Sequence, residues 1–278
     1  MRKLALSMPV AALAAVLISL PVMGTGCQKL QARDHLNKGV TAFRNAQYPE
    51  AVEHFKQAVE LDPKFPTARL YLATAYMQQW IPGAVSPEND NMAKAAENTF
   101  RDVLKDDPKN ATAMAYLASL FLNQQKWDEA REWYDKLTAV DPKNAIGYYS
   151  KGWIAWSQWY PAYGNARNAM GMKQEDPGPM KDKKIKEELK AKYGPVIEDG
   201  LKNLDMALQV DPEYDDAMAY ENLLIRERAD LADTKEEYEQ QIKVANDWVD
   251  KAMATKKIKT ERKQKTAGGI VQDQTDQK

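Results

Sequence analysis

The sequence is poor in the residues that cross-link chains or bind soft metals. Its 278 residues include one cysteine, Cys27, and two histidines, His35 and His54. One cysteine excludes an intramolecular disulfide, so stability must come from packing. Zinc-type sites need several Cys or His ligands, and His54 stands beside Phe55 at a position expected on a helix surface. We therefore expect no metal and no cofactor.

The chain also has almost no net charge, and it lacks the usual catalytic motifs. Its 39 basic side chains nearly balance 40 acidic ones, so no overall field attracts nucleic acid, and no nucleic-acid partner is expected. A glycine-rich phosphate loop, HExxH and GxSxG are all missing from the sequence. The many carboxylates fall at helix starts or on exposed helix faces, where capping explains them. The sequence predicts a protein that is not an enzyme.

Beyond residue 22 no apolar run approaches the length of a membrane span. The N-terminal residues 1–26 have the layout of a secretory signal: a short basic head, an uncharged apolar run, and Gly24-Thr25-Gly26 directly before Cys27. This layout resembles the bacterial lipoprotein signal, in which such a cysteine is lipidated and becomes the mature N-terminus. That family usually has Leu where Gly24 stands. A plain secretory signal and an uncleaved anchor helix are the alternatives.

Four Asp-Pro pairs recur along the chain, at residues 62–63, 107–108, 141–142 and 211–212. Each closes an amphipathic run, as in EAREWYDKLTAVDP. Proline has no amide donor and biases the residue before it away from helix, so a recurring stop indicates a repeated helical unit. From Pro108 to Pro142 the spacing is 34 residues, the period of a known helix–turn–helix repeat.

The third unit, ATAMAYLASLFLNQQKWDEAREWYDKLTAVDPKN, resembles the tetratricopeptide repeat (TPR) over its whole length. It has Leu117 and Ala118 in the first helix, and Ala130 and Tyr134 in the second. Small residues allow the helices to cross closely, and large ones fill the seam. Leu137 stands where the family usually has Ala. The resemblance implies an all-α fold, a right-handed superhelical solenoid of helix–turn–helix repeats.

The repeats predict the domain organisation. A solenoid over residues 27–254 is expected to contain repeats at about 32–65, 66–110, 111–144 and 145–214, and a fifth at 215–254 that lacks the closing proline and caps the open end. Insertions between helices are expected at about residues 78–91 and 160–195. The polar segment 255–278 is predicted to be a disordered tail.

In TPR proteins the first helix of each repeat lines a concave groove for a peptide or a helix of a partner. Transferring these positions predicts a protein-binding groove of Phe43, Leu70, Met77, Leu122, Tyr149, Trp153 and Trp156. The Lys, Asn and Arg clamp of chaperone-binding members is absent, and the aromatic side chains favour an apolar or aromatic ligand. A Trp stripe at helical spacing is more often part of a core than of a ligand site, with a helix at Lys181–Lys192 folding over it as a lid; both interpretations stay open.

These observations predict a non-catalytic, lipid-anchored TPR scaffold that mediates protein–protein interactions or complex assembly in the bacterial cell envelope. Cys27 is the lipidated residue, and Gln28-Lys29 follow it without an Asp. By resemblance to lipoproteins of two-membrane bacteria, this favours the outer membrane, facing the periplasm. The expected partners are envelope proteins or peptides, and membrane lipid through the anchor. An envelope enzyme with a site formed by the insertion, or an oligomeric structural subunit, are the alternatives.

Overall fold

The computed structural model describes residues 22–173 and 175–272, and within them it contains ten α-helices and no strand. Residues 1–21, most of the expected signal segment, lie outside the described residues. The chain divides into two compact units, unit 1 (Met1–Tyr116) and unit 2 (Leu117–Lys278), with the boundary inside α5. No helix of the described ranges combines the length and apolar composition that crossing a bilayer requires.

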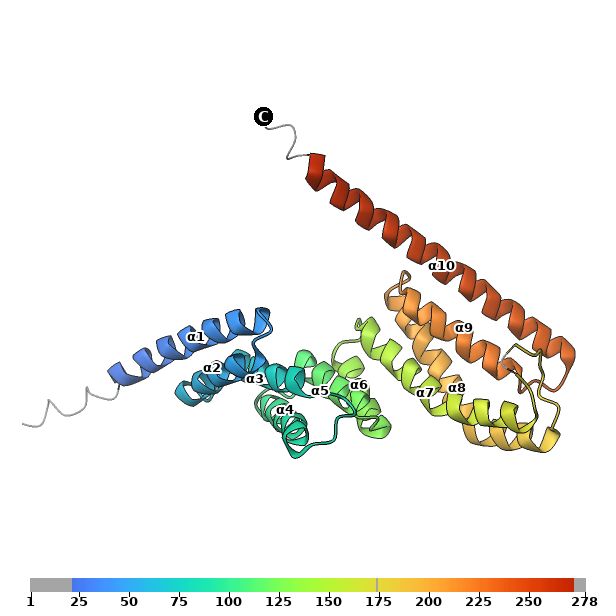
Figure 1. Ribbon diagram of the computed structural model, residues 1–278, viewed down its shortest axis with the longest axis horizontal. Coiled ribbons are helices and arrows are strands. Elements are labelled where there is room, and N and C mark those ends of the chain that lie inside the picture. Colours follow the sequence, from blue (N-terminus) through green and yellow to red (C-terminus); the bar gives the residue numbers. More distant parts are fainter. Residues whose placement is uncertain (1–21, 174, 273–278) are drawn as a thin grey trace, which may run out of the picture. The chain divides into compact units, whose positions relative to one another are not determined.

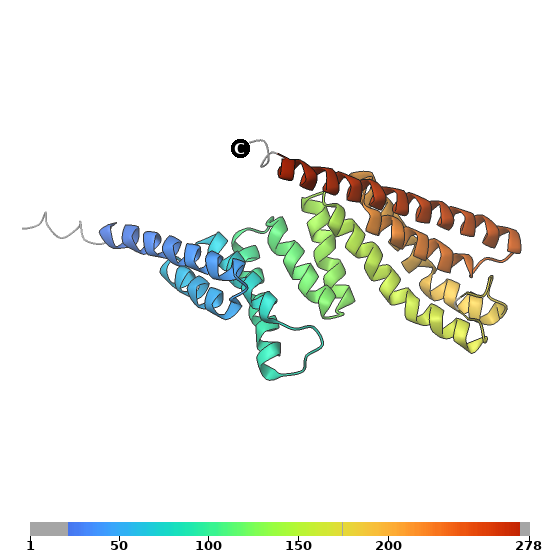
Figure 2. The same ribbon diagram turned by 45° about the horizontal axis from the view of Figure 1, so that its top comes forward.

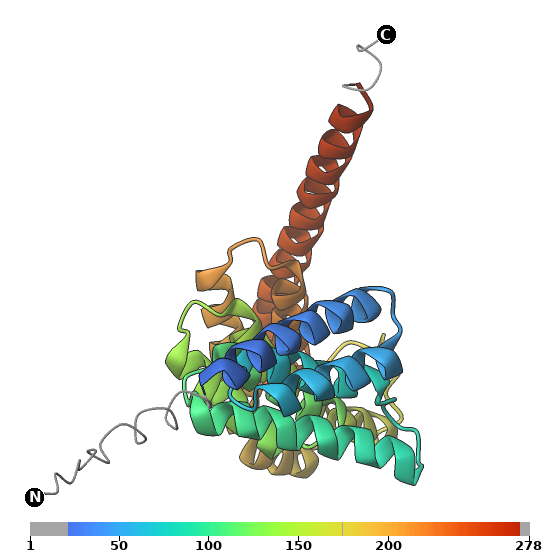
Figure 3. The same cartoon turned by 90° about the vertical axis from the view of Figure 1, so that its left-hand side faces the viewer.

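The helices follow one another in pairs (Figure 1). Unit 1 contains α1 (Val22–Arg44), α2 (Tyr48–Leu61), α3 (Pro66–Gln79), α4 (Pro87–Asp106) and the first part of α5 (Ala111–Asn123). Unit 2 contains the rest of α5, then α6 (Trp127–Val140), α7 (Ala145–Ala169), α8 (Lys183–Val210), α9 (Asp215–Ala229) and α10 (Lys235–Gln272). Within the units α1 packs on α2, α3 on α4, α7 on α8 and α9 on α10 (Figures 2 and 3). The predicted all-α fold of helix–turn–helix repeats is confirmed.

The Asp-Pro pairs end helices as the sequence predicts. Asp62, Asp107, Asp141 and Asp211 are the C-caps of α2, α4, α6 and α8, with φ between −139° and −125° and ψ between 82° and 94°. This is the extended backbone that a following proline imposes. Three of the four carboxylates also accept a hydrogen bond from the amide two residues later. The same local chemistry therefore produces the same turn in each repeat.

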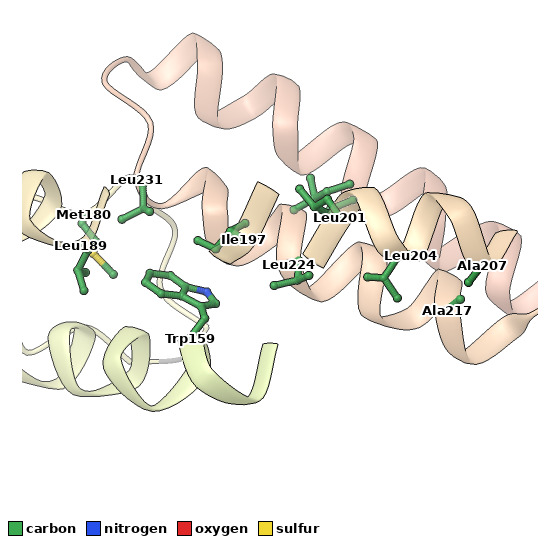
Figure 4. Close-up of a cluster of buried hydrophobic side chains, with 12 residues drawn as sticks. Trp159, Met180, Leu189, Ile197, Leu201, Leu204, Ala207, Ala217, Leu224 and Leu231 are labelled. Atoms are coloured by element: carbon green, nitrogen blue, oxygen red, sulfur yellow. The ribbon is translucent and has the colours of Figure 1, made fainter. Parts of the chain in front are cut away.

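Glycines lie where paired helices cross most closely. A Cβ atom at Gly39 of α1 would lie 2.5 Å from the ring of Phe55 of α2, and one at Gly152 of α7 would lie 2.5 Å from Leu204 of α8. No larger residue fits these crossings without displacing a buried side chain. Unit 1 has its core around Phe55, between α1, α2 and α3. Unit 2 has a second core around Trp159 and Leu204 (Figure 4).

The first insertion forms a short loop, residues 80–86, between α3 and α4. Asn89 fixes it: its Oδ1 accepts from the amide of Ile81 at 2.7 Å, and its Nδ2 donates to the carbonyls of Ile81 and Ala84 at 2.8 Å. Ser86 caps α4 by accepting from the amide of Asn89 at 3.1 Å. The loop is thus shorter than the 78–91 expected from sequence, because Ser86 and Pro87 already start the next helix.

The second insertion differs from its prediction. Residues 160–195 do not form a separate lid with its own helix at Lys181–Lys192. Instead they lengthen the two helices that flank them: α7 continues through Pro161 to Ala169, and α8 runs from Lys183 through Pro195 to Val210. The run KDKKIKEELKAK is rich in good helix formers, and α8 continues from it through Gly194 and Pro195. Only the connection between α7 and α8 is non-helical.

The C-terminal segment is also more ordered than predicted. A disordered tail was expected from residue 255, but α10 continues as one helix to Gln272. The carbonyl of Glu213 accepts a hydrogen bond from Lys259 at 3.2 Å, and Lys259 also pairs with Asp215. Arg262 pairs with Glu213 at 2.6 Å. These contacts hold the C-terminal part of α10 against the turn between α8 and α9. The prediction of disorder rested on composition, which does not account for such tertiary contacts.

Candidate functional site

The structure brings two of the predicted groove residues together in unit 1. Phe43 of α1 and Leu70 of α3 line a cavity of about 340 Å³, whose other lining residues are Tyr71, Thr74, Gln78, Thr112 and Tyr116. Met77 is half-buried on α3 and does not line it. No charged side chain lines this cavity. We call these seven lining residues the groove of unit 1.

Aromatic contacts hold the walls of this groove in place. The ring of Phe43 meets Tyr71 edge-on at 6.4 Å, and Tyr71 stacks on the buried Phe55 at 5.4 Å. On the other wall, Tyr116 of α5 stacks on the buried Phe100 at 5.7 Å and stays 38% exposed. Aromatic rings fixed in this way bind an apolar partner with little loss of side-chain entropy. The groove is therefore preorganised for an uncharged ligand.

The other four predicted groove residues lie in unit 2 and are half-buried. Tyr149 and Trp156 pack against the core of this unit. The indole N–H of Trp153 donates to the hydroxyl of Tyr220 at 2.8 Å, so the stripe on α7 faces α9. Leu122, the fourth, lies on α5 and lines none of the cavities described here. Whether these four residues bind a partner stays a prediction.

A cavity that the sequence did not predict lies between α7 and α9 of unit 2. It measures about 220 Å³, and we call it the Glu227 cavity. Glu227 is 5% exposed, and its Oε1 accepts from the indole N–H of Trp156 at 3.1 Å. Burial raises the pKa of Glu227 to about 7, the indoles of Trp156 and Trp159 oppose the shift, and the charge of Asp230 adds to it. In the segment ENLLIRERAD, residues 221–230, the two glutamates Glu221 and Glu227 have no sequence pattern that distinguishes a buried acid from an exposed one. No sequence signal therefore reveals this site.

Beside this cavity lies a buried ion pair. Arg167 of α7 is 4% exposed and pairs with Asp230, the C-cap of α9, which is 2% exposed. Tyr163 donates to the same carboxylate at 3.0 Å. Arg167 also donates to the carbonyls of Lys173 and, at 2.7 Å, Asp176. The pair therefore ties the connection between α7 and α8 to the end of α9.

The two histidines do meet, although they form no metal site with other ligands. Nδ1 of His35 on α1 lies 3.4 Å from Nδ1 of His54 on α2. Among the residues that the structure describes, no group of three or more His, Cys, Asp or Glu side chains is placed to hold a metal ion. A single hydrogen bond between the two imidazoles explains their contact.

A second buried carboxylate leads to a pH prediction. Glu221 of α9 is 4% exposed, and burial, with a contribution from Asp205, raises its pKa from 4.5 to about 8 while Arg228 opposes the shift. Between these two pH values the folded chain binds more protons than the unfolded chain, so stability falls as pH rises. We expect Glu221→Gln to remove this loss.

The gain of this variant over the wild type should grow from about pH 5 to about pH 9, reaching on the order of 3 kcal/mol. Urea unfolding at both pH values measures it. Glu188→Gln, at an exposed position of α8, controls for the loss of a surface charge. A gain for Glu221→Gln that does not change with pH contradicts the prediction.

Comparisons with known proteins agree with this architecture. Family models described as "Tetratricopeptide repeat" and "TPR repeat" match residues 90–151 and 43–79. The mitochondrial import receptor subunit TOM70 of Rattus norvegicus is 33% identical over 110 residues, and the Mus musculus protein is 32% identical over the same length. Each match covers 40% of this chain and 17% of TOM70, so the chain corresponds to a minor part of those proteins.

Solved structures of MamA share the fold. A crystal structure of MamA has a TM-score of 0.53 at 13% identity, covering 83% of this chain and 94% of that one. MamA of Desulfovibrio magneticus RS-1, from residue 41 to its end, has a TM-score of 0.54 at 15% identity, covering 82% and 96%. At such identities the likeness concerns the fold alone.

The helix pairs, the repeated Asp-Pro caps, the close glycine crossings and the two matched repeat models lead to the same conclusion. Helical repeats of this kind present surfaces for other proteins. The chain contains tetratricopeptide repeats, and these repeats support a role as a scaffold for protein–protein interaction.

Proposed function

We propose that this chain is a non-catalytic scaffold of the bacterial cell envelope that binds a segment of a partner protein in the groove of unit 1. The observation that carries the proposal is the groove itself: about 340 Å³ of uncharged, aromatic-walled space whose lining includes Phe43 and Leu70, two of the positions predicted from the TPR resemblance to line the ligand groove. TOM70 is named as a receptor subunit. The binding of a protein partner is the one property carried over from it.

The lining selects the chemistry of the partner. Phe43, Leu70, Tyr71 and Tyr116 offer apolar surface, while the exposed Gln78 and Thr112 offer uncharged hydrogen-bonding groups. A charged residue buried here finds no opposite charge, which costs binding energy. The partner segment is therefore one with aromatic or aliphatic side chains, and such side chains supply most of an interface's energy.

The groove is tested by charging it without disturbing the fold. Gln78→Lys with Thr112→Lys places two cations at exposed positions of the lining, and Thr67→Lys adds one at an exposed position of α3 outside it. Partners are captured from envelope extracts with the wild type and identified by mass spectrometry, and their affinity is then titrated. We expect the double variant to weaken binding at least about tenfold, with Thr67→Lys unchanged. Equal affinities for all three chains contradict the groove assignment.

The tether of this proposal is lipid on Cys27. Cys27 is exposed near the start of α1. Acyl chains on one cysteine hold a protein on a bilayer because each buried methylene adds about 0.8 kcal/mol. By the lipoprotein resemblance, the tether lies in the outer membrane and the repeats face the periplasm.

Cys27→Ser is expected to leave the chain either uncleaved or free of the membrane, because the hydroxyl does not replace the lipidated thiol. Detergent-phase partitioning of the mature wild type and the variant measures this. The mature wild type should enter the detergent phase. An unmodified thiol on a mature chain that stays in the aqueous phase contradicts the lipid anchor.

The alternative of an enzyme with a site in the insertion receives less support from the side chains. Acid–base hydrolysis uses two carboxylates with separate roles. In the Glu227 cavity the one lining carboxylate is Glu227, and the nearby Asp230 is held by Arg167 and Tyr163. This arrangement favours binding over catalysis.

A further inference from the structure

The two histidines of the chain meet across the first helix pair of unit 1. Nδ1 of His35, on α1, lies 3.4 Å from Nδ1 of His54, on α2, and the ring centroids are 5.6 Å apart. In a neutral imidazole one nitrogen carries the proton and the other accepts, so one hydrogen bond joins the two rings. Neutral imidazole is also the commonest metal ligand in proteins. Two nitrogens of this kind are therefore held close together by two different helices.

The separation of these nitrogens is that of two ligands of one tetrahedral metal ion. Imidazole nitrogens bind zinc at about 2.0–2.1 Å, and two such ligands at the tetrahedral angle lie about 3.3–3.4 Å apart. Two ligands at a right angle, as in square-planar Cu²⁺ or Ni²⁺ sites, lie about 2.8–3.0 Å apart at the same bond length. The observed separation of 3.4 Å matches the tetrahedral case.

The surroundings of the pair supply the outer part of a metal site. Nε2 of His54 lies 4.0 Å from Oε1 of Glu50, one turn earlier on α2. A histidine that binds a metal through one nitrogen commonly donates its other ring N–H to a carboxylate, which fixes the ring and its tautomer. Both residues also line a cavity of about 330 Å³ between α1 and α2. The side chain of His54 is 25% exposed, so an ion and its water ligands can reach it.

The charges around the pair are compatible with a bound cation. Of the residues that line this cavity, Lys38 is the one cation and Glu50 is the one carboxylate. The ammonium of Lys38 lies 2.7 Å from the carboxylate of Asp34 and is neutralised by it. The charge of Glu50 therefore remains beside His54. Among the described residues no third ligand side chain joins the two histidines, so water completes the coordination.

We propose that His35 and His54 bind one zinc ion through their Nδ1 atoms, with water in the remaining positions. The histidine that carries its proton on Nδ1 moves it to Nε2 through solvent, so binding releases no net proton. The ion joins α1 to α2 and stabilises the folded chain as the zinc concentration rises. Neither histidine lines the groove of unit 1, so this site is independent of the proposed function.

The imidazole signals report directly on this site, because the chain has only these two histidines. The full-length chain with Cys27→Ser, prepared without a histidine tag and labelled with ¹⁵N in histidine, is titrated with zinc chloride at about pH 7.5. The substitution removes the exposed thiol, which is itself a zinc ligand. We expect both imidazoles to respond with one common midpoint and a stoichiometry of one zinc ion per chain. Magnesium chloride should change neither signal, because Mg²⁺ prefers oxygen ligands.

His35→Gln and His54→Gln should each weaken zinc binding at least about tenfold. Glu50→Gln keeps both ligands and should weaken it about tenfold through the lost carboxylate, whereas Glu60→Gln, at an exposed position of α2, should not. Zinc should raise the melting temperature of the parent chain but not of the histidine variants, whose folding is checked by circular dichroism without zinc. Separate midpoints for the two histidines, an equal response to Mg²⁺, or unchanged zinc affinity in either histidine variant overturns the proposal.

Discussion

Replacing Trp159 with alanine is expected to lower the free energy of unfolding of unit 2 by about 3–5 kcal/mol. Trp159 is fully buried, and Figure 4 shows its indole beside Met180, Leu189 and Ile197. Met180 lies in the connection before α8, and Leu189 and Ile197 lie on α8, so the variant leaves a cavity between α7 and these residues. Urea unfolding followed by circular dichroism measures the loss.

Asn165→Ala is the matched control for this prediction. Asn165 lies on the same helix and is exposed, so its replacement should change the free energy of unfolding by less than about 0.5 kcal/mol. Trp153→Ala should fall between the two, because Trp153 is half-buried and loses one hydrogen bond to Tyr220. A loss for Trp159→Ala no greater than that of the control contradicts the assignment of Trp159 to the core.

Replacing Arg167 with methionine is expected to cost a similar amount, about 3–5 kcal/mol, for a different reason. Methionine keeps much of the volume but leaves the carboxylate of Asp230 buried without its cation. The carbonyls of Lys173 and Asp176 lose their donor as well. Thermal or urea unfolding of the single variant measures the loss.

The partner variant separates a lost charge from lost packing. If the cost comes from the unpaired carboxylate, Asp230→Asn in the Arg167→Met background should recover part of the stability, giving a coupling energy above about 1 kcal/mol. Lys190→Met removes the ion-pair partner of the exposed Asp233, whose carboxylate lies 2.6 Å from the Lys190 ammonium. This variant should lower the free energy of unfolding by less than about 1 kcal/mol. Strictly additive effects of Arg167→Met and Asp230→Asn contradict the role of the ion pair.

The features that the sequence predicts correctly are local. Asp62, Asp107, Asp141 and Asp211 end helices because the backbone before a proline is restricted whatever surrounds it. The rule that small residues allow helices to cross closely also holds at Gly39 and Gly152, where a missing Cβ permits the approach. Phe43 and Leu70, two positions taken from the TPR resemblance, line the same cavity, and their role in binding stays a prediction.

Other predictions fail or stay open because they depend on which helix covers which. The Trp stripe on α7 has a single periodicity, yet Trp159 is core while Trp153 and Trp156 contact α9. The helix considered at Lys181–Lys192 is the first part of α8, and its Leu189 packs into the same core as Trp159. The segment from residue 255, expected as a disordered tail, is helical because Lys259 and Arg262 form ion pairs with Asp215 and Glu213 near the start of α9.

The sequence by itself determined the all-α class and the helix ends at the Asp-Pro pairs, since these depend on backbone restrictions within a few residues. Only the tertiary structure decided which polar groups lose water. Glu227 and Arg167 look like surface charges in the sequence. The packing of α7 and of the connection after it against α9 buries both side chains. Burial depends on contacts made by residues distant in the chain, and these contacts create the Glu227 cavity.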